Sequence, residues 1–173
     1  MIHSSGQIIS ATAAEVIQDG IGAAKDADGY ERVSFKAVCV ADSPTGEDAG
    51  NHGLLYGPWV KEASEGDDEN FLGVIGDDTV PYANREPQAI TDRNPIVDPR
   101  DSKRRTFIVG DEMTVETYGI LSVIAADDIT QGKWLKLADG GAFQEGQRSD
   151  GIGLAIESAK AGERFRAIIN VIN

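Results

Sequence analysis

FIVGDEMTVETYGILSVIAADDITQGKWLKLADGGAF occupies residues 107 to 143 and shows most directly how this chain folds. Short apolar or alternating segments follow one another here, and turns rich in glycine or acidic residues separate them. No stretch of roughly 10 to 15 residues between them repeats its apolar side chains at the spacing of a helix. Short strands joined by turns indicate an antiparallel sandwich or barrel and not a parallel sheet.

The same pattern extends to both sides of this stretch. In the last segment, Phe165, Ala167, Ile169 and Val171 alternate with Arg164, Arg166 and Asn170, which is the period of a half-buried strand. We therefore predict an all-β fold, a small antiparallel β-barrel or sandwich domain with long irregular loops and an N-terminal arm. The expected strands are Val33–Val40, Phe71–Gly76, Thr106–Val109, Met113–Thr117, Tyr118–Ala125, Lys133–Leu137, Ile152–Ile156 and Arg164–Ile172.

The segment VSFKAVCV (Val33 to Val40) has its own alternation. One face carries Val33, Phe35, Ala37 and Cys39, and the other carries Ser34 and Lys36, so we expect Lys36 to face water. Cys39, the single cysteine, is then an inert buried thiol, and it has no partner for an internal disulfide.

Glycines recur directly before strands. Gly110, Gly132 and Gly162 each stand between a small or polar residue and a charged residue, where a positive φ commonly turns the chain into a strand. LADGGAF (Leu137 to Phe143) is predicted to be a hairpin turn with glycines at its tip. We interpret the similar sequence context of these three glycines as common turn geometry in preference to a true internal repeat.

The N-terminal segment and the middle of the chain differ from this pattern. ATAAEVIQD (residues 11 to 19) favours a short helix, so we divide the chain into an N-terminal arm or short helix at 1–30 and a β-rich domain at 31–173. Residues 80–103 hold four of the six prolines and are expected to form a long irregular insertion. The acidic stretch 41–53 is a turn-rich loop.

Length and charge limit the possible functions. The 173 residues suit one domain that can bury a core. The net charge of −13 argues against nucleic-acid binding, because it repels phosphate over most of the surface. The longest apolar run, GILSVIAA (Gly119 to Ala126), is too short to span a bilayer. The opening residues, MIHSSGQIIS, lack the basic start and apolar stretch of a secretion signal, so we expect synthesis in a cytosol.

Basic residues gather in the proline-rich segment of this acidic chain. Between Arg85 and Arg105 there are six basic and four acidic side chains, which suggests a loop that faces a partner. Pairing with the protein's own acidic surface is an open alternative. The candidate contact residues are Arg93, Arg100, Lys103, Arg104 and Arg105.

The groups needed for catalysis are scarce. The only histidines are His3 and His52, and no nucleotide-binding, zinc-protease or redox motif occurs. Asp26 and Asp28 begin like a calcium loop, but Gly29 comes too early and Ala37 stands where the closing glutamate belongs. Lys133 is poorly placed for a biotin- or lipoyl-carrier turn. We expect no enzyme activity, no cofactor and no metal.

The regular part of the chain resembles the cement, or head-decoration, proteins of tailed bacteriophages. The resemblance rests on the order of FLGVIGDD (71–78), the stretch 107–143 quoted above, and GIGLAIESAKAGERFRAIIN (151–170). These segments have the family's succession of an apolar strand, a Gly-Asp turn, a strand such as GILSV, a Thr-x-Gly turn and a closing Ala-Gly-Glu hairpin. The segments 41–53 and 81–103 depart from the family as insertions.

The resemblance implies a structural virion protein that binds the outer face of an assembled capsid. Its partner would be the major capsid protein, it would act as a trimer or dimer on the shell, and it would be made in the host cytoplasm. Trp59 and Trp134 could serve as interface aromatics, although a core role is the stronger expectation for each. Two other classes stay open: a low-copy virion or tail adaptor or fibre-base protein, and a carbohydrate-processing or carrier domain.

Overall fold

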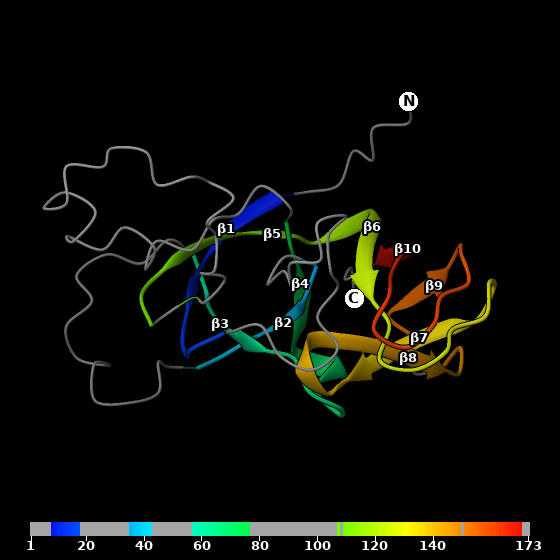
Figure 1. Ribbon diagram of the computed structural model, residues 1–173. Coiled ribbons are helices and arrows are strands. Elements are labelled where there is room, and N and C mark those ends of the chain that lie inside the picture. The colour runs from blue at the N-terminus through cyan, green and yellow to red at the C-terminus, as the bar shows by residue number, and fades with distance from the viewer. Residues whose placement is uncertain are drawn as a thin grey trace, which may run out of the picture.

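The computed structural model describes residues 8–17, 35–42, 57–76, 107, 109–149 and 151–170. In these ranges the chain forms strands and two short 3-10 turns, which confirms the predicted all-β class (Figure 1). The strands fall into a closed five-stranded barrel and a separate five-stranded sheet, called the C-terminal sheet below. The proline-rich segment 80–103 and most of the loop 41–53 lie outside the described residues.

The barrel is built from the N-terminal strands and one later strand. Its order is β1-β3-β2-β4-β5, with all neighbours antiparallel except β1 and β3, which run parallel. Strand β5 joins β1 on one side and β4 on the other and so closes the circle. The strands are β1 (Ile8–Ala13), β2 (Ala37–Val40), β3 (Trp59–Glu62), β4 (Phe71–Ile75) and β5 (Glu112–Glu116).

The helix predicted at residues 11 to 19 is wrong. Strand β1 occupies Ile8–Ala13, and the chain then bends so that Ile17 forms a two-hydrogen-bond bridge with Phe107. Alanine's helix propensity is a weak preference, and here burial decides, because Ala11, Ala13 and Ile17 all lie inside the barrel. This part of the predicted arm is a wall of the barrel.

The C-terminal sheet holds the regular segments of the second half. Its order is β6-β10-β9-β7-β8 and every pair is antiparallel. Thr117 alone joins β5 of the barrel to β6 of this sheet. The predicted hairpin at Leu137–Phe143 is confirmed, with Gly140 and Gly141 at φ 75° and 70° in its tip. The strands are β6 (Tyr118–Ile124), β7 (Trp134–Ala138), β8 (Ala142–Gly146), β9 (Gly153–Ala155) and β10 (Arg164–Asn170), and the turn η4 (Asp139–Gly141) joins β7 to β8.

The glycine turns have the predicted conformation, and two of them are parts of a repeat. Gly110, Gly132 and Gly162 have φ values of 93°, 83° and 82°. The Gly132 amide donates to the Ala155 carbonyl (2.8 Å), and the Gly162 amide donates to the Ala125 carbonyl (2.7 Å). Each residue of one contact lies thirty positions from its counterpart in the other. Our interpretation as turn geometry alone is therefore incomplete.

The strand register follows the same relationship. Trp134 pairs with Leu154 in β7 and β9, and their counterparts Arg164 and Ile124 pair in β10 and β6. The segments around residues 124–135 and 154–165 are thus related by an approximate two-fold axis. In each arm a turn amide donates to a carbonyl of the other arm, and these hydrogen bonds stabilise the sheet.

Strands β2 and β4 bury both of their faces. Val38 and Ile75 point into the barrel, whereas Cys39 and Val74 belong to a second cluster shared with the C-terminal sheet. There the Phe71 ring meets the Phe143 ring edge-to-face at 5.9 Å. Strands buried on both faces are continuously apolar, which explains AVCV and FLGVI.

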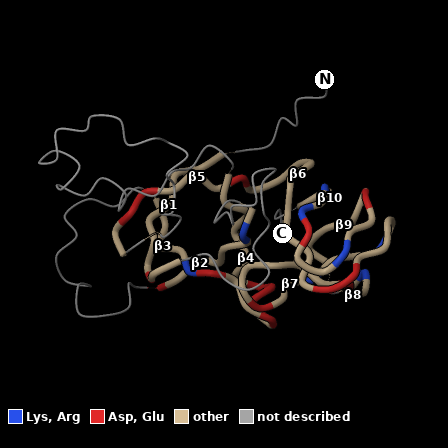
Figure 2. The backbone as a smooth tube through the Cα atoms, viewed as in Figure 1, with Lys and Arg blue, Asp and Glu red and all other residues tan. Residues whose placement is uncertain are grey.

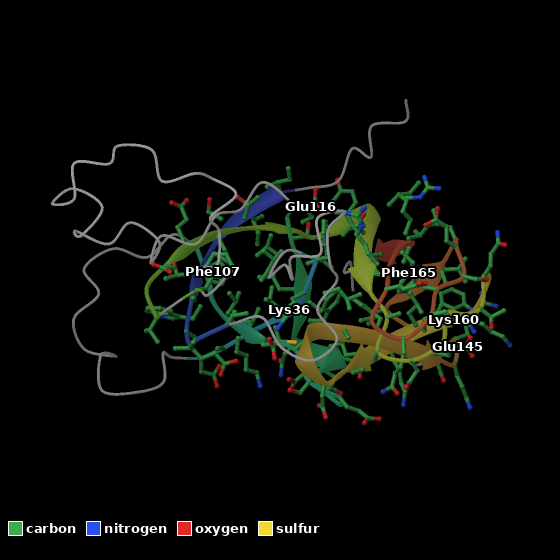
Figure 3. The ribbon with its side chains drawn as sticks, viewed as in Figure 1. Lys36, Phe107, Glu116, Glu145, Lys160 and Phe165 are labelled. Carbon is green, nitrogen blue, oxygen red and sulfur yellow. The ribbon has the colours of Figure 1, made fainter. Side chains whose placement is uncertain are left out.

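Lys36 does not face water as we expected. It is 2% exposed, and its Nζ donates to Glu62 Oε2 at 2.7 Å. The hairpin tip covers it, since a Cβ on Gly141 would lie 2.9 Å from Lys36 Cβ and 3.0 Å from the Ala37 carbonyl oxygen. Figure 3 shows Lys36 at the junction of the barrel and the C-terminal sheet. The prediction failed because the face opposite Cys39, which we expected to be solvated, is the side of the segment that carries Val38 and turns into the closed barrel.

Candidate interaction surfaces

The described residues contain no cluster of side chains of the kind that binds a metal ion. In the ranges given above, no group of three or more His, Cys, Asp and Glu side chains could hold a metal ion. His3, His52, Asp26 and Asp28 lie outside those ranges. In the described part of the chain, no helix has the length and apolar character to cross a bilayer.

Cys39 is buried, as predicted. Its side chain is fully inaccessible, and its Sγ donates to the Asp67 carbonyl oxygen at 3.6 Å. Burial raises the pKa of the thiol to about 12, and the negative charge of Asp67 adds to the rise. A thiol that stays protonated is a poor nucleophile.

The basic residues singled out by sequence are not described. Arg93, Arg100, Lys103, Arg104 and Arg105 all fall between residues 77 and 106, outside the described residues. Their role in contacting a partner stays a prediction.

The outward side of the C-terminal sheet carries an apolar row. Ile120, Ile168, Leu154 and Trp134 stand on β6, β10, β9 and β7, and each is the direct cross-strand partner of the next. Ile120 is 38% exposed, Ile168 is 42% exposed, and Leu154 and Trp134 are half-buried. We call these four residues the apolar row. Contiguous exposed apolar surface in a soluble protein is typical of an interaction site.

Sequence reasoning missed this row although the signal was present. Ile168 belongs to the outward set of the last strand, with Arg164 and Arg166, so alternation alone predicts an exposed isoleucine. What the sequence could not give is the register that sets Ile168 between Ile120 and Leu154.

The two tryptophans do not take the core role that we favoured. Trp134 and Trp59 are both half-buried and belong to neither apolar cluster. The Arg148 guanidinium lies 6.0 Å from the centre of the Trp134 ring, and Gly151 packs against the same indole. Trp134 therefore ends the apolar row as a ring held in place from two sides.

Two exposed ion pairs hold the turns of this sheet. Arg166 Nε donates to Glu157 Oε1 at 2.7 Å, and Lys160 Nζ donates to Asp128 Oδ2 at 2.7 Å. These hydrogen bonds lower the pKa of the Glu157 and Asp128 carboxyls and raise that of Lys160. The pair between Lys160 and Asp128 lies at the end of the C-terminal sheet far from the barrel, where Figure 3 labels Lys160.

Charge is divided between the two halves of the molecule. Among the described residues, those up to Glu116 include two Lys or Arg and ten Asp or Glu, whereas those from Thr117 onward include six of each. Figure 2 shows the Lys and Arg positions of the backbone mostly on and around β7 to β10. The barrel is thus strongly acidic and the C-terminal sheet is neutral.

One outward face of the barrel combines acidic groups with an exposed isoleucine. Ile8 of β1, 60% exposed, lies directly opposite Glu116 of β5, and Thr12 lies opposite Glu112. Glu112, Thr114 and Glu116 alternate with the buried Met113 and Val115 and so share the outward side of β5. We call Ile8, Ser10, Glu112, Thr114 and Glu116 the acidic barrel face.

Comparison with known proteins adds a structural likeness. No family model matches the sequence, and no curated protein matches it. The chain is similar to the crystal structure of the head fiber gp8.5 N base of bacteriophage phi29, with a TM-score of 0.48 and 16% sequence identity. The alignment covers 95% of this chain and 93% of that one.

Proposed function

We propose that this chain is a structural virion protein of a tailed bacteriophage that binds the outer face of the assembled capsid. There it would stabilise contacts between neighbouring major capsid subunits. Its partners would be the major capsid protein and further copies of itself, as a trimer or dimer on the shell. It would be made in the host cytoplasm and act on the virion exterior.

The observation that carries the proposal is the order of its β segments. The succession that resembles the cement proteins folds as strands in that order: FLGVI as β4, EMTVE as β5, YGILSVI as β6, WLKLA as β7 and RFRAIIN as β10. The glycines that open three of these segments have positive φ, as such turns require. The strands and glycine turns on which the resemblance rests are therefore present in the structure of this chain.

A protein that clamps neighbouring capsid subunits together is also consistent with the charge distribution of the described surface. It needs no active site, and it gains strength when a modest interface is repeated around a symmetric shell. An acidic barrel facing outward would keep neighbouring particles apart. The basic residues from Arg93 to Arg105 would meet acidic patches of the shell, since arginine pairs with carboxylates through two parallel hydrogen bonds.

Co-sedimentation with mature shells that lack this protein tests the proposal. The expected result is saturation at one copy per major capsid subunit or at a simple fraction of that ratio. A few copies per particle would indicate the adaptor or fibre-base alternative, and no binding to expanded shells would refute the clamp.

The basic segment is tested in the same assay. Changing Arg100, Lys103, Arg104 and Arg105 together to alanine should lower shell occupancy and flatten its dependence on salt. Two single variants provide a matched control, Arg104→Ala inside the basic segment and Lys133→Ala outside it. Each removes one positive charge, and Lys133 is an exposed residue next to β7 of the C-terminal sheet. Unchanged occupancy and salt dependence in the fourfold variant would contradict the assignment.

A further inference from the structure

The apolar row is an outward surface without a cover in the described part of the chain. It crosses four neighbouring strands at one level, so its side chains form a single band perpendicular to the strands. Ile168 and Ile120, at one end of the band, retain 42% and 38% exposure. Burying such a band is favourable, at about 25 cal/mol for each Å² of apolar surface removed from water.

A cation stands at the other end of the band. The exposed Arg148 stacks on Trp134, and none of the described carboxylates lies within ion-pair distance of it. Tryptophan and arginine are the residue types most enriched where protein interfaces gain their affinity. The band therefore favours a partner that presents an apolar side chain together with carboxylates.

The acidic barrel face of the same chain has that chemistry. Ile8 is its most exposed apolar side chain, and the carboxylate of Glu116 is directly across from it in the β1–β5 register. Glu112 adds a second carboxylate on the same outward side of β5, four register positions from Glu116. An isoleucine among carboxylates complements an apolar row that ends in an arginine.

We propose that the apolar row of one copy docks on the acidic barrel face of a second copy. Association by two barrels is opposed by charge, because each described barrel has an excess of eight acidic groups. The C-terminal sheet is neutral, so it can approach an acidic barrel without that repulsion. The contact is between two different surfaces of one chain, and it stands whether or not the protein binds a shell.

Sedimentation equilibrium of the full chain over a range of concentrations, with no shells present, tests the proposal. The wild-type protein should self-associate, and Ile168→Glu should raise the dissociation constant by about ten-fold or more, because it sets a carboxylate against an acidic face. Val16→Glu is the control: Val16 is 53% exposed on the barrel side and outside both surfaces, so its dissociation constant should stay that of the wild type. If Ile168→Glu does not fold, Arg148→Glu replaces it, because Arg148 is exposed and away from the core. It should likewise raise the dissociation constant.

Mixing two defective variants identifies which surfaces meet. Glu112→Lys damages only the acidic barrel face, and Ile168→Glu damages only the apolar row. An equimolar mixture of the two should associate more tightly than either variant alone, because one intact row can meet one intact barrel face. A wild-type protein that remains monomeric at every concentration overturns the proposal, and so does a mixture that associates no better than its parts, which would mean that row meets row.

Discussion

Ile129 and Ala159 exchange their backbone hydrogen bonds: each amide donates to the carbonyl of the other, at 2.8 Å and 3.0 Å. The two residues lie thirty positions apart, as do Gly132 and Gly162 beside them. The bridge therefore lies next to the axis that relates the two arms of the C-terminal sheet, and equivalent changes in the two arms should have equal effects.

The two glycines give the most direct test of this equivalence. Gly132→Ala and Gly162→Ala each force a side chain into positive φ, while a Cβ at either site would meet nothing within 4 Å. Each should lower the free energy of unfolding by about 1 kcal/mol, and by the same amount. Urea unfolding measures both, and effects that differ by more than about 0.5 kcal/mol would contradict the structural repeat.

Gly141 should be far more sensitive than these two. It also has positive φ, but its Cβ would press on Lys36 and the Ala37 backbone at the junction of the two sheets. We expect Gly141→Ala to cost about 3 kcal/mol in unfolding free energy, the sum of backbone strain and overpacking. Gly66→Ala is the matched control, because Gly66 has φ 91° and open space around its Cβ.

The buried ion pair at the junction should contribute more to stability than an exposed one. Lys36→Ala leaves Glu62 without its cation, so we expect a loss of about 2 to 4 kcal/mol in urea unfolding. Lys61→Ala removes a 3.3 Å pair with Asp67 whose lysine is 38% exposed, and it should cost less than about 1 kcal/mol. Equal losses in the two variants would show that burial of Lys36 has no energetic consequence.

The thiol of Cys39 should be unreactive toward maleimide in the folded protein. With its pKa raised to about 12 by burial, almost none of it is thiolate at pH 8. Maleimide labelling followed by mass spectrometry should give no modification in buffer and complete modification in denaturing urea. Rapid labelling of the native protein would contradict the packing of β2.

Acid should weaken the exposed ion pairs of the C-terminal sheet. The hydrogen bond from Lys160 lowers the pKa of Asp128 in the folded state, so this carboxylate stabilises the fold above its unfolded pKa of 3.8. That contribution is lost as the pH falls through the lower, folded-state value. The wild-type unfolding free energy should therefore fall below about pH 4 more steeply than that of Asp128→Asn.

Asp127→Asn is the control for this measurement. It removes the same charge from the neighbouring position and keeps the pair between Lys160 and Asp128. Identical pH profiles for the wild type and Asp128→Asn would show that the pair does not couple proton binding to folding.

Much of the sheet structure was predictable because its causes are local. The segments that became β4 to β7, β9 and β10 are short, apolar or alternating, and bounded by turns whose glycines need positive φ. Strand β1 was missed because its alanines carry no β signal, and only pairing with β3 and β5 makes it a strand. The burial of Lys36 and the alignment of the apolar row depend on contacts between distant segments, which no local pattern contains.

Thr117 is the whole connection between the barrel and the C-terminal sheet on the path from β5 to β6. A one-residue link next to a shared apolar cluster leaves no slack for a hinge, so the two halves should turn and shift together. A pull on β10 would therefore reach β5 through the paired strand β6 and Thr117, without first stretching a loop. Stiffness of this kind lets a small protein pass a load from one end to the other with little loss.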